Sequence, residues 1–153
     1  PGRKVKGVIP GGMSMPILPV SQLDVPMANE FLRERKTMLG TGGVMVLDDT
    51  TCMVRVGCVI TYFFRDESCG QCTQCREGTG WLNKIMQRIE RGAGSLADID
   101  ILLDVAGKME GQTICAFADA AAWPVQGLLR HFREDFEAHV THGKCPFPQS
   151  FEL

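Results

Sequence analysis

The sequence lacks several features that would place it in a common class. Its 16 Lys and Arg residues are outnumbered by 18 Asp and Glu residues, so the formal net charge of -2 offers no basic field to a nucleic-acid backbone. No apolar run approaches the roughly 18–20 residues of a membrane-spanning helix. G-x-G-x-x-G, Walker and Ser-His-Asp signatures are also absent. We therefore expect no nucleic-acid partner and no direct membrane insertion.

The composition is that of an ordinary globular protein. The chain has 153 residues, of which 44% are hydrophobic and 22% charged, which is enough for one domain or two small ones without disulfide bonds. Its seven cysteines are an odd number, and three of them lie close together. This pattern favours metal ligation in a reducing compartment over a secreted disulfide framework.

The first third of the chain predicts a small α+β unit. Lys4–Ile9 has the pattern of a short strand, and the glycines that follow it indicate a tight loop. Good helix formers at Glu30–Met38 predict a short helix that Gly40 ends. The continuous apolar run Val44–Leu47 predicts a buried strand.

The rest of the chain predicts a helical bundle. Residues Met53–Phe64 are ambiguous, because their β-branched side chains favour a strand while their apolar spacing also fits a helix. Apolar positions at helical spacing from Trp81 to Ile89 predict a helix. Ser95 and Asp98 have the spacing of a capping box and predict the start of a second helix.

Two further helices are expected near the C-terminus. Thr113 is a candidate cap for a third helix over Cys115–Trp123. Pro124 suits the first turn of a fourth helix, which carries apolar residues as far as Phe136. The tail from residue 143 is expected to be irregular.

Cys69, Cys72 and Cys75 follow one another at intervals of three residues. A single metal ion is usually bound by two separate Cys-x-x-Cys pairs. Three consecutive ligands instead suit a 4Fe-4S cluster, because a short loop can wrap one face of the cube and direct its backbone N–H groups at the sulfides. The alternatives are a zinc site or unliganded thiols.

The fourth ligand has to come from elsewhere in the chain. Cys115 is favoured because it follows a candidate cap at the start of a helix, where the dipole stabilises thiolate and cluster charge. Cys145, which precedes a proline, is the alternative. We expect Cys52 and Cys58 to be small apolar core residues of the first unit. The three histidines, His131, His139 and His142, are expected to be solvated, although the last two could share a helix face and bind a metal.

Six segments carry a more specific signature: ESCGQCTQCREG (67–78), GQTIC (111–115), DAAAWPVQG (119–127), PGGMSMP (10–16), LDVPM (23–27) and LGTGGVMVLD (39–48). They resemble the NADH-binding flavoprotein subunit of respiratory complex I, the NADH:quinone oxidoreductase, over essentially the whole chain. Two positions depart from that pattern, since Gln74 and Phe117 stand where the family usually has Pro and Leu. These changes are expected to affect the stability of the loop and the reduction potential of the site, and they leave all the candidate ligands in place.

The resemblance implies a fold and a set of ligands. Cys69, Cys72, Cys75 and Cys115 would hold one 4Fe-4S cluster, and Met53–Phe64 would be helical. Residues 1–52 would be part of a soluble-ligand-binding β-grasp domain. Residues 53–145 would be the helical 4Fe-4S-binding domain, and residues 146–153 a tail.

The resemblance also implies a function. In the intact subunit, FMN reduced by NADH would pass single electrons to this cluster and on to other peripheral-arm iron-sulfur subunits. Ala116 and Phe117 would lie near the FMN. The NADH site and most of the FMN site would belong to a domain that precedes this C-terminal fragment, so the fragment alone would not catalyse NADH oxidation. The complex would place the chain peripherally on the cytoplasmic or mitochondrial matrix side of the inner membrane.

Two alternatives remain open at this stage. Related subunits of NAD-reducing hydrogenases and NAD-dependent formate dehydrogenases share the same motifs. A structural metal-binding interaction module with four cysteine ligands, and with no redox role, would use the same residues.

Overall fold

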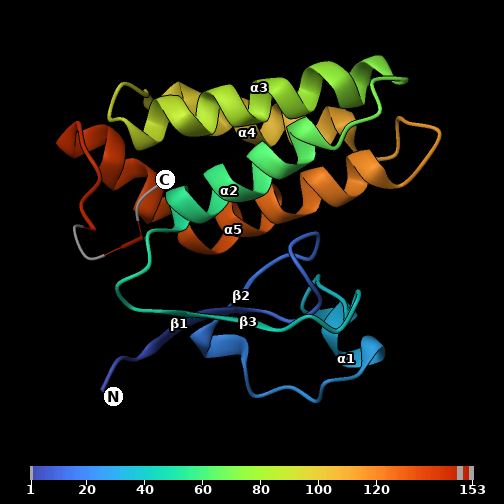
Figure 1. The fold of residues 1–153 in the computed structure, drawn as a ribbon. Helices are drawn as coiled ribbons and strands as arrows, with labels where there is room; N and C mark the ends of the chain where they lie inside the picture. The colour runs from blue at the N-terminus through green and yellow to red at the C-terminus, as the bar shows by residue number, and fades with distance from the viewer. Residues whose placement is uncertain (1, 148–149, 152–153) are drawn as a thin grey trace.

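The computed structural model describes residues 2–147 and 150–151. It has an α+β fold in which a small sheet precedes a bundle of helices, as the sequence predicts (Figure 1). In chain order the elements are β1 (Val5–Ile9), β2 (Leu18–Pro19), the 3-10 helix η1 (Val20–Gln22), α1 (Asn29–Glu34), β3 (Met45–Asp48), α2 (Met53–Asp66), α3 (Thr73–Glu90), α4 (Leu96–Met109) and α5 (Phe117–His142). Among the described residues, no helix is both long and apolar enough to cross a membrane.

The sheet packs beneath the helices α2 and α5, and α3 and α4 cover the opposite side of that pair (Figure 1). The backbone of β1 comes close to α5 at Gly7, where a Cβ atom would lie 3.1 Å from the ring of Phe132. Lys6, also on β1, donates to the carboxylate of Asp135 on α5 at 2.6 Å. Both side chains of this ion pair are largely buried, so it ties the sheet to the bundle.

The sheet is antiparallel with strand order β2-β1-β3. Val8 of β1 pairs with Leu18 on one side and with Val46 on the other. The strand predicted at Val44–Leu47 is present as β3, but the prediction that it is buried is wrong, because β3 lies at the edge and Val46 is 62% exposed. A continuous apolar run usually indicates a strand that is buried on both faces. In the part of the chain that the structure describes, however, β3 pairs with one strand, β1, and leaves its other edge open.

The helix expected at Glu30–Met38 is shorter than predicted. It ends at Glu34, and Lys36 then adopts a left-handed conformation with φ of 58°. This turn brings Thr37 to the core, where its hydroxyl donates to the carbonyl of Pro16 at 2.7 Å. Gly40 therefore lies outside the helix rather than at its end.

Residues Met53–Asp66 form the helix α2, which confirms the expectation from the resemblance and overrides strand propensity. Burial explains the outcome, since the apolar face of α2 packs on both α3 and α5. Gly57 allows the contact with α3, because a Cβ atom there would lie 2.9 Å from Met86. Tertiary packing thus decides the structure of an ambiguous segment.

The expected boundary at Pro124 is wrong. Residues Phe117–His142 form one helix, and its backbone departs from helical geometry at Phe132, with φ of -135° and ψ of 28°. A proline inside a helix removes one backbone hydrogen bond and crowds the carbonyl four residues earlier, yet its φ is compatible with a helix, and α5 continues through Pro124. By contrast, the capping box of Ser95 and Asp98 is present at the start of α4, as predicted.

Candidate metal centre

The three closely spaced cysteines lie where α2 gives way to α3. Cys72 is the N-cap residue of α3, and Cys75 lies in its first turn, so this helix begins earlier than the apolar pattern indicated. Cys75 is buried, while Cys69 is exposed on the loop. The positive end of the α3 dipole and its free N–H groups therefore face the part of the chain that carries these sulfurs.

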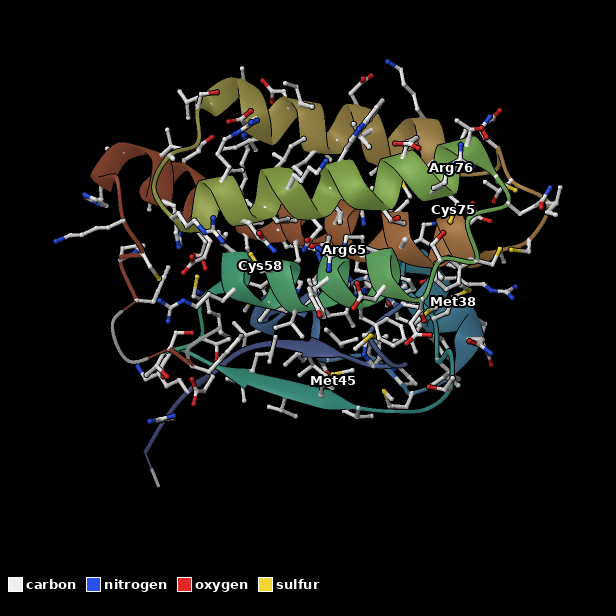
Figure 2. All side chains as sticks on the ribbon, turned by 45° about the horizontal axis from the view of Figure 1, so that its top comes forward. Met38, Met45, Cys58, Arg65, Cys75 and Arg76 are labelled. Atoms are coloured by element: carbon white, nitrogen blue, oxygen red, sulfur yellow. The ribbon has the colours of Figure 1, made fainter. Side chains whose placement is uncertain are left out.

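Arg76 holds the loop in shape. Its guanidinium donates to the carbonyl of Gly70 at 2.7 Å, and Gly70 has a φ of 79°, which favours glycine. The hydroxyl of Ser68 lies 3.3 Å from the sulfur of Cys75. Figure 2 shows Cys75 and Arg76 close together at the start of α3. The loop is thus braced from both of its ends.

Cys115 lies on the connection between α4 and α5, two residues before α5 begins. Glu110 at the end of α4 accepts hydrogen bonds from Trp123 at 2.8 Å and from Gln126 at 2.9 Å. Asp119 accepts from the backbone N–H of Gly111 at 2.6 Å. These bonds from the first turns of α5 fix both the end of α4 and the loop that presents Cys115.

Thr113 does not cap a helix, contrary to the sequence expectation. Its hydroxyl donates to the carbonyl of Cys115 at 2.8 Å, and α5 has no side-chain cap at Ala116. The neighbouring Ile114 is 83% exposed, which is unusual for a large apolar side chain and was not singled out from the sequence.

All four cysteines line one cavity of about 280 Å³ between the two loops. Burial raises the pKa of the Cys75 thiol, and the nearby sulfurs of Cys115, Cys69 and Cys72 raise it further, while the hydrogen bond with Ser68 lowers it. Thiolates that repel one another in this way are stabilised when they share a cation. The donor set, four sulfurs around one open space, fits an iron-sulfur cluster.

The spacing of the sulfurs bears on the choice between a cluster and a single ion. A tetrahedral zinc ion with bonds of about 2.3 Å holds its sulfurs about 3.8 Å apart. Among the described residues, the group of potential ligands whose donor atoms all lie within 4.8 Å of one another is Cys52, His139 and Cys145. No three sulfurs of the four-cysteine cavity lie that close together, which is compatible with a cube that has one thiolate per iron.

Two expectations for the remaining cysteines and histidines need correction. Cys52 and Cys58 are buried, as predicted, but they lie on α2 at the helical bundle rather than in the first unit. His139 is fully buried, not solvated, and His131 is partly buried with no hydrogen-bond partner for its Nε2. A histidine seven positions after Phe132 on α5 faces inward for the same reason that the apolar residues do, so helical spacing was the available signal.

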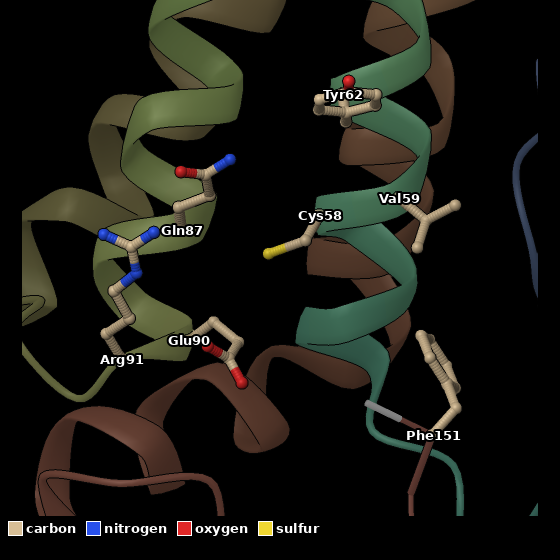
Figure 3. Close-up of a pocket in the computed structure, with 7 residues that line it drawn as sticks. All are labelled: Cys58, Val59, Tyr62, Gln87, Glu90, Arg91 and Phe151. Carbon is tan, nitrogen blue, oxygen red and sulfur yellow. The ribbon is translucent and has the colours of Figure 1, made fainter. Parts of the chain in front are cut away.

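A larger cavity, of about 620 Å³, lies between α2 and α3 and contains Cys58 (Figure 3). The sulfur of Cys58 points across it toward α3, which contributes Gln87, Glu90 and Arg91. Burial raises the pKa of this thiol to about 12, so it stays protonated at neutral pH. The thiol of Cys58 is therefore not an activated nucleophile.

Four thiols around one cavity, with one thiol at a helix N-terminus and another just before the next helix, are typical of iron-sulfur electron-transfer proteins. Residues 57–139 match the family described as the NADH-ubiquinone oxidoreductase-F iron-sulfur binding region, and the chain belongs to this family. The family carries a 4Fe-4S cluster with an electron-transfer role.

Relatives of known name agree with this assignment. The F 2 subunit of the NADH-quinone oxidoreductase of Rhizobium meliloti (strain 1021) is 47% identical over 147 residues, which are 96% of this chain and 35% of that protein. The F subunit of the same enzyme in Mycobacterium bovis (strain ATCC BAA-935 / AF2122/97) is 47% identical over 95% of this chain and 33% of its own length. The chain thus spans about a third of these relatives.

Two solved structures agree with this family assignment. The crystal structure of NAD+-reducing NiFe-hydrogenase in the H2-reduced state matches with a TM-score of 0.80 and 32% identity, over 90% of this chain and 23% of that one. The air-oxidized state of NAD+-reducing NiFe-hydrogenase matches 98% of this chain and 24% of that one, with the same TM-score and 30% identity.

Proposed function

We propose that Cys69, Cys72, Cys75 and Cys115 hold a 4Fe-4S cluster. The observation that carries this proposal is the convergence of these four sulfurs, from two loops about 40 residues apart, on one cavity. No three of these sulfurs lie within 4.8 Å of one another, whereas a tetrahedral zinc ion holds its sulfurs about 3.8 Å apart. When bound, such a cluster supplies a one-electron carrier whose potential depends on ligation, hydrogen bonding and burial.

Each part of the site has a distinct role in this proposal. The free N–H groups at the start of α3 stabilise negative charge on the sulfurs. Arg76 keeps the Gly70 turn in place and adds positive charge beside it. The hydrogen bonds of Glu110 and Asp119 hold the Cys115 loop at a fixed position. The chain's own contribution is to fix the ligands in position.

We further propose that the intact protein passes electrons singly from NADH-reduced FMN through this site to iron-sulfur clusters of partner subunits. Ala116 is exposed beside the cavity and Phe117 lines it, so both are candidates for contact with the FMN. In the relatives, the residues matched here are only about a third of the protein. The NADH site and most of the FMN site would then belong to the preceding domain, and the fragment alone would not oxidise NADH.

The same proposal extends to organisation and location. Residues 1–52 would be part of a β-grasp domain and residues 53–145 the cluster-binding domain. Residues 146–153 would be a tail, of which 148–149 and 152–153 lie outside the described residues. The chain would be a peripheral subunit on the cytoplasmic side of the inner membrane, or on the matrix side in mitochondria. The equivalent subunit of an NAD-reducing hydrogenase is the second candidate, because both matched crystal structures come from such enzymes.

Anaerobic purification, followed by iron and sulfide analysis and EPR after dithionite, tests the proposal. A 4Fe-4S protein is expected to be brown, with about four irons per chain, and to give an S = 1/2 signal on reduction. Colourless protein in which the four cysteines bind zinc would instead support the structural metal-binding module.

A further inference from the structure

A second group of ligand-type side chains lies at the opposite end of α2. Cys52 is the N-cap residue of α2, His139 lies on α5 and Cys145 follows that helix. The sulfur of Cys52 lies 3.3 Å from Nε2 of His139, and the donor atoms of all three residues lie within 4.8 Å of one another. Since α2 spans about 20 Å, this group is separate from the four-cysteine cavity.

The imidazole of His139 is oriented for ligation. Its Nδ1 lies 2.7 Å from the carbonyl oxygen of Asp135. A carbonyl can only accept, so Nδ1 carries the proton and the lone pair of Nε2 points at the sulfur of Cys52. A histidine ligand held through its other nitrogen by a backbone carbonyl is the usual arrangement around protein-bound metals.

The distances suit a single ion. A tetrahedral zinc with bonds of about 2.3 Å to sulfur and about 2.0–2.1 Å to nitrogen places those two donors about 3.6 Å apart. The observed 3.3 Å separation is close to this value. Two thiolates and one divalent cation are also neutral together, which a site with two fully buried ligands requires.

We propose that Cys52, His139 and Cys145 bind one Zn²⁺ ion, with water completing the tetrahedron. Binding displaces the protons of both thiols, while the imidazole enters as the neutral ligand. The ion joins the start of α2, the end of α5 and the segment that follows, so its role is structural. This inference goes beyond the electron-transfer role and does not depend on it.

Without a cation the same atoms have other partners. The sulfur of Cys52 lies within hydrogen-bond distance of Nε2 of His139, at 3.3 Å, and the donor atom of Cys145 lies within 4.8 Å of both. The metal-free alternatives are therefore a thiol–imidazole hydrogen bond or a disulfide between the two cysteines.

A crossed set of variants tests the proposal. The chain and its variants are reconstituted anaerobically with iron and sulfide in the presence of Zn²⁺, desalted and analysed for both metals. Cys145→Ser should lose the zinc and keep the iron, whereas Cys72→Ser should lose the iron and keep the zinc. Cys58→Ser, another buried cysteine of α2, should keep both. Zinc retained in Cys145→Ser at the stoichiometry of the unmodified chain would overturn the proposal.

Cobalt provides a second readout, which begins with the unmodified chain and reports the coordination itself. Added to the unmodified chain, Co²⁺ should give thiolate charge-transfer bands and the visible absorption of a tetrahedral site. His139→Gln should weaken Co²⁺ binding by more than the roughly 10–100-fold typical of losing an outer-shell partner. No such bands, or mass spectrometry that finds Cys52 and Cys145 as a disulfide or as free thiols with Zn²⁺ in excess, would overturn the proposal.

Discussion

Phe64 at the end of α2 and Phe117 at the start of α5 meet edge to face, with ring centroids 5.4 Å apart and planes inclined by 77°. Phe64 lies in the last turn of α2, just before the three-cysteine loop, and the Cys115 loop ends at Phe117. This aromatic contact therefore joins the two segments that converge on the candidate cluster. It gives the substitution of Phe for the usual Leu at position 117 a structural role.

Phe117→Ala should destabilise the chain and loosen the cavity. Truncating a fully buried Phe costs about 3–5 kcal/mol, and we expect about 2 kcal/mol for this half-buried ring. Denaturant unfolding of the reconstituted chain measures the change. Phe117→Leu is the matched control, because it keeps most of the apolar volume and removes only the aromatic contact; it should lose less than half as much stability, and no loss at all in Phe117→Leu would contradict the role of the aromatic contact.

Arg76→Ala should shorten the lifetime of the cluster. Without the guanidinium, the carbonyl of Gly70 loses its 2.7 Å hydrogen bond, and the turn between Cys69 and Cys72 is freer to open. Loss of visible absorbance on exposure to a chelator should be several-fold faster than in the unmodified chain. Lys84→Ala, at an exposed position on the same helix, should change nothing. Equal rates in the two variants would show that Arg76 does not brace the loop.

Asp98 links the stability of the bundle to pH. Burial alone would raise the pKa of this carboxyl, but the hydrogen bonds from Arg88 and Ser95 outweigh it and hold the pKa below its usual range. Because the folded pKa is the lower one, the stabilisation is present above the unfolded value of about 3.9 and is lost as the pH falls through the folded value.

Asp98→Asn should therefore reduce the free energy of unfolding at pH 7 by about 1 kcal/mol, the typical contribution of a helix cap. The difference between this variant and the unmodified chain should shrink as the pH falls below about 4, the usual pKa of an aspartate. Urea unfolding at neutral pH and in acid measures it. A difference that grows in acid would mean that the carboxylate does not stabilise the folded state.

The sequence was informative where local patterns and packing agree. The capping box at Ser95 and the apolar stripe of α3 depend on neighbours three or four residues away, so they could be read directly. The helical state of Met53–Asp66 could not be predicted from local sequence, because its β-branched residues favour a strand in isolation. Contact with α3 and α5 makes this segment helical.

The features that the sequence did not predict share a cause, because they depend on long-range contacts. The exposure of Val46 follows from the position of β3 at the sheet edge, and the contact of His139 with the sulfur of Cys52, 87 residues away, follows from the packing of α5 on α2. Neither relationship is visible in a window of sequence. The convergence of Cys115 with the loop cysteines is equally long-range, and it was predictable because the motif spacing implies a missing fourth ligand.

The choice of Cys115 as the fourth ligand is the central claim, and paired serine variants test it most directly. Cys115→Ser and Cys145→Ser are reconstituted side by side, and iron content and the EPR signal of the reduced protein are measured. We predict that Cys115→Ser loses the native S = 1/2 signal and most of its iron, while Cys145→Ser keeps both. An intact signal in Cys115→Ser, with loss of the signal in Cys145→Ser, would contradict the account.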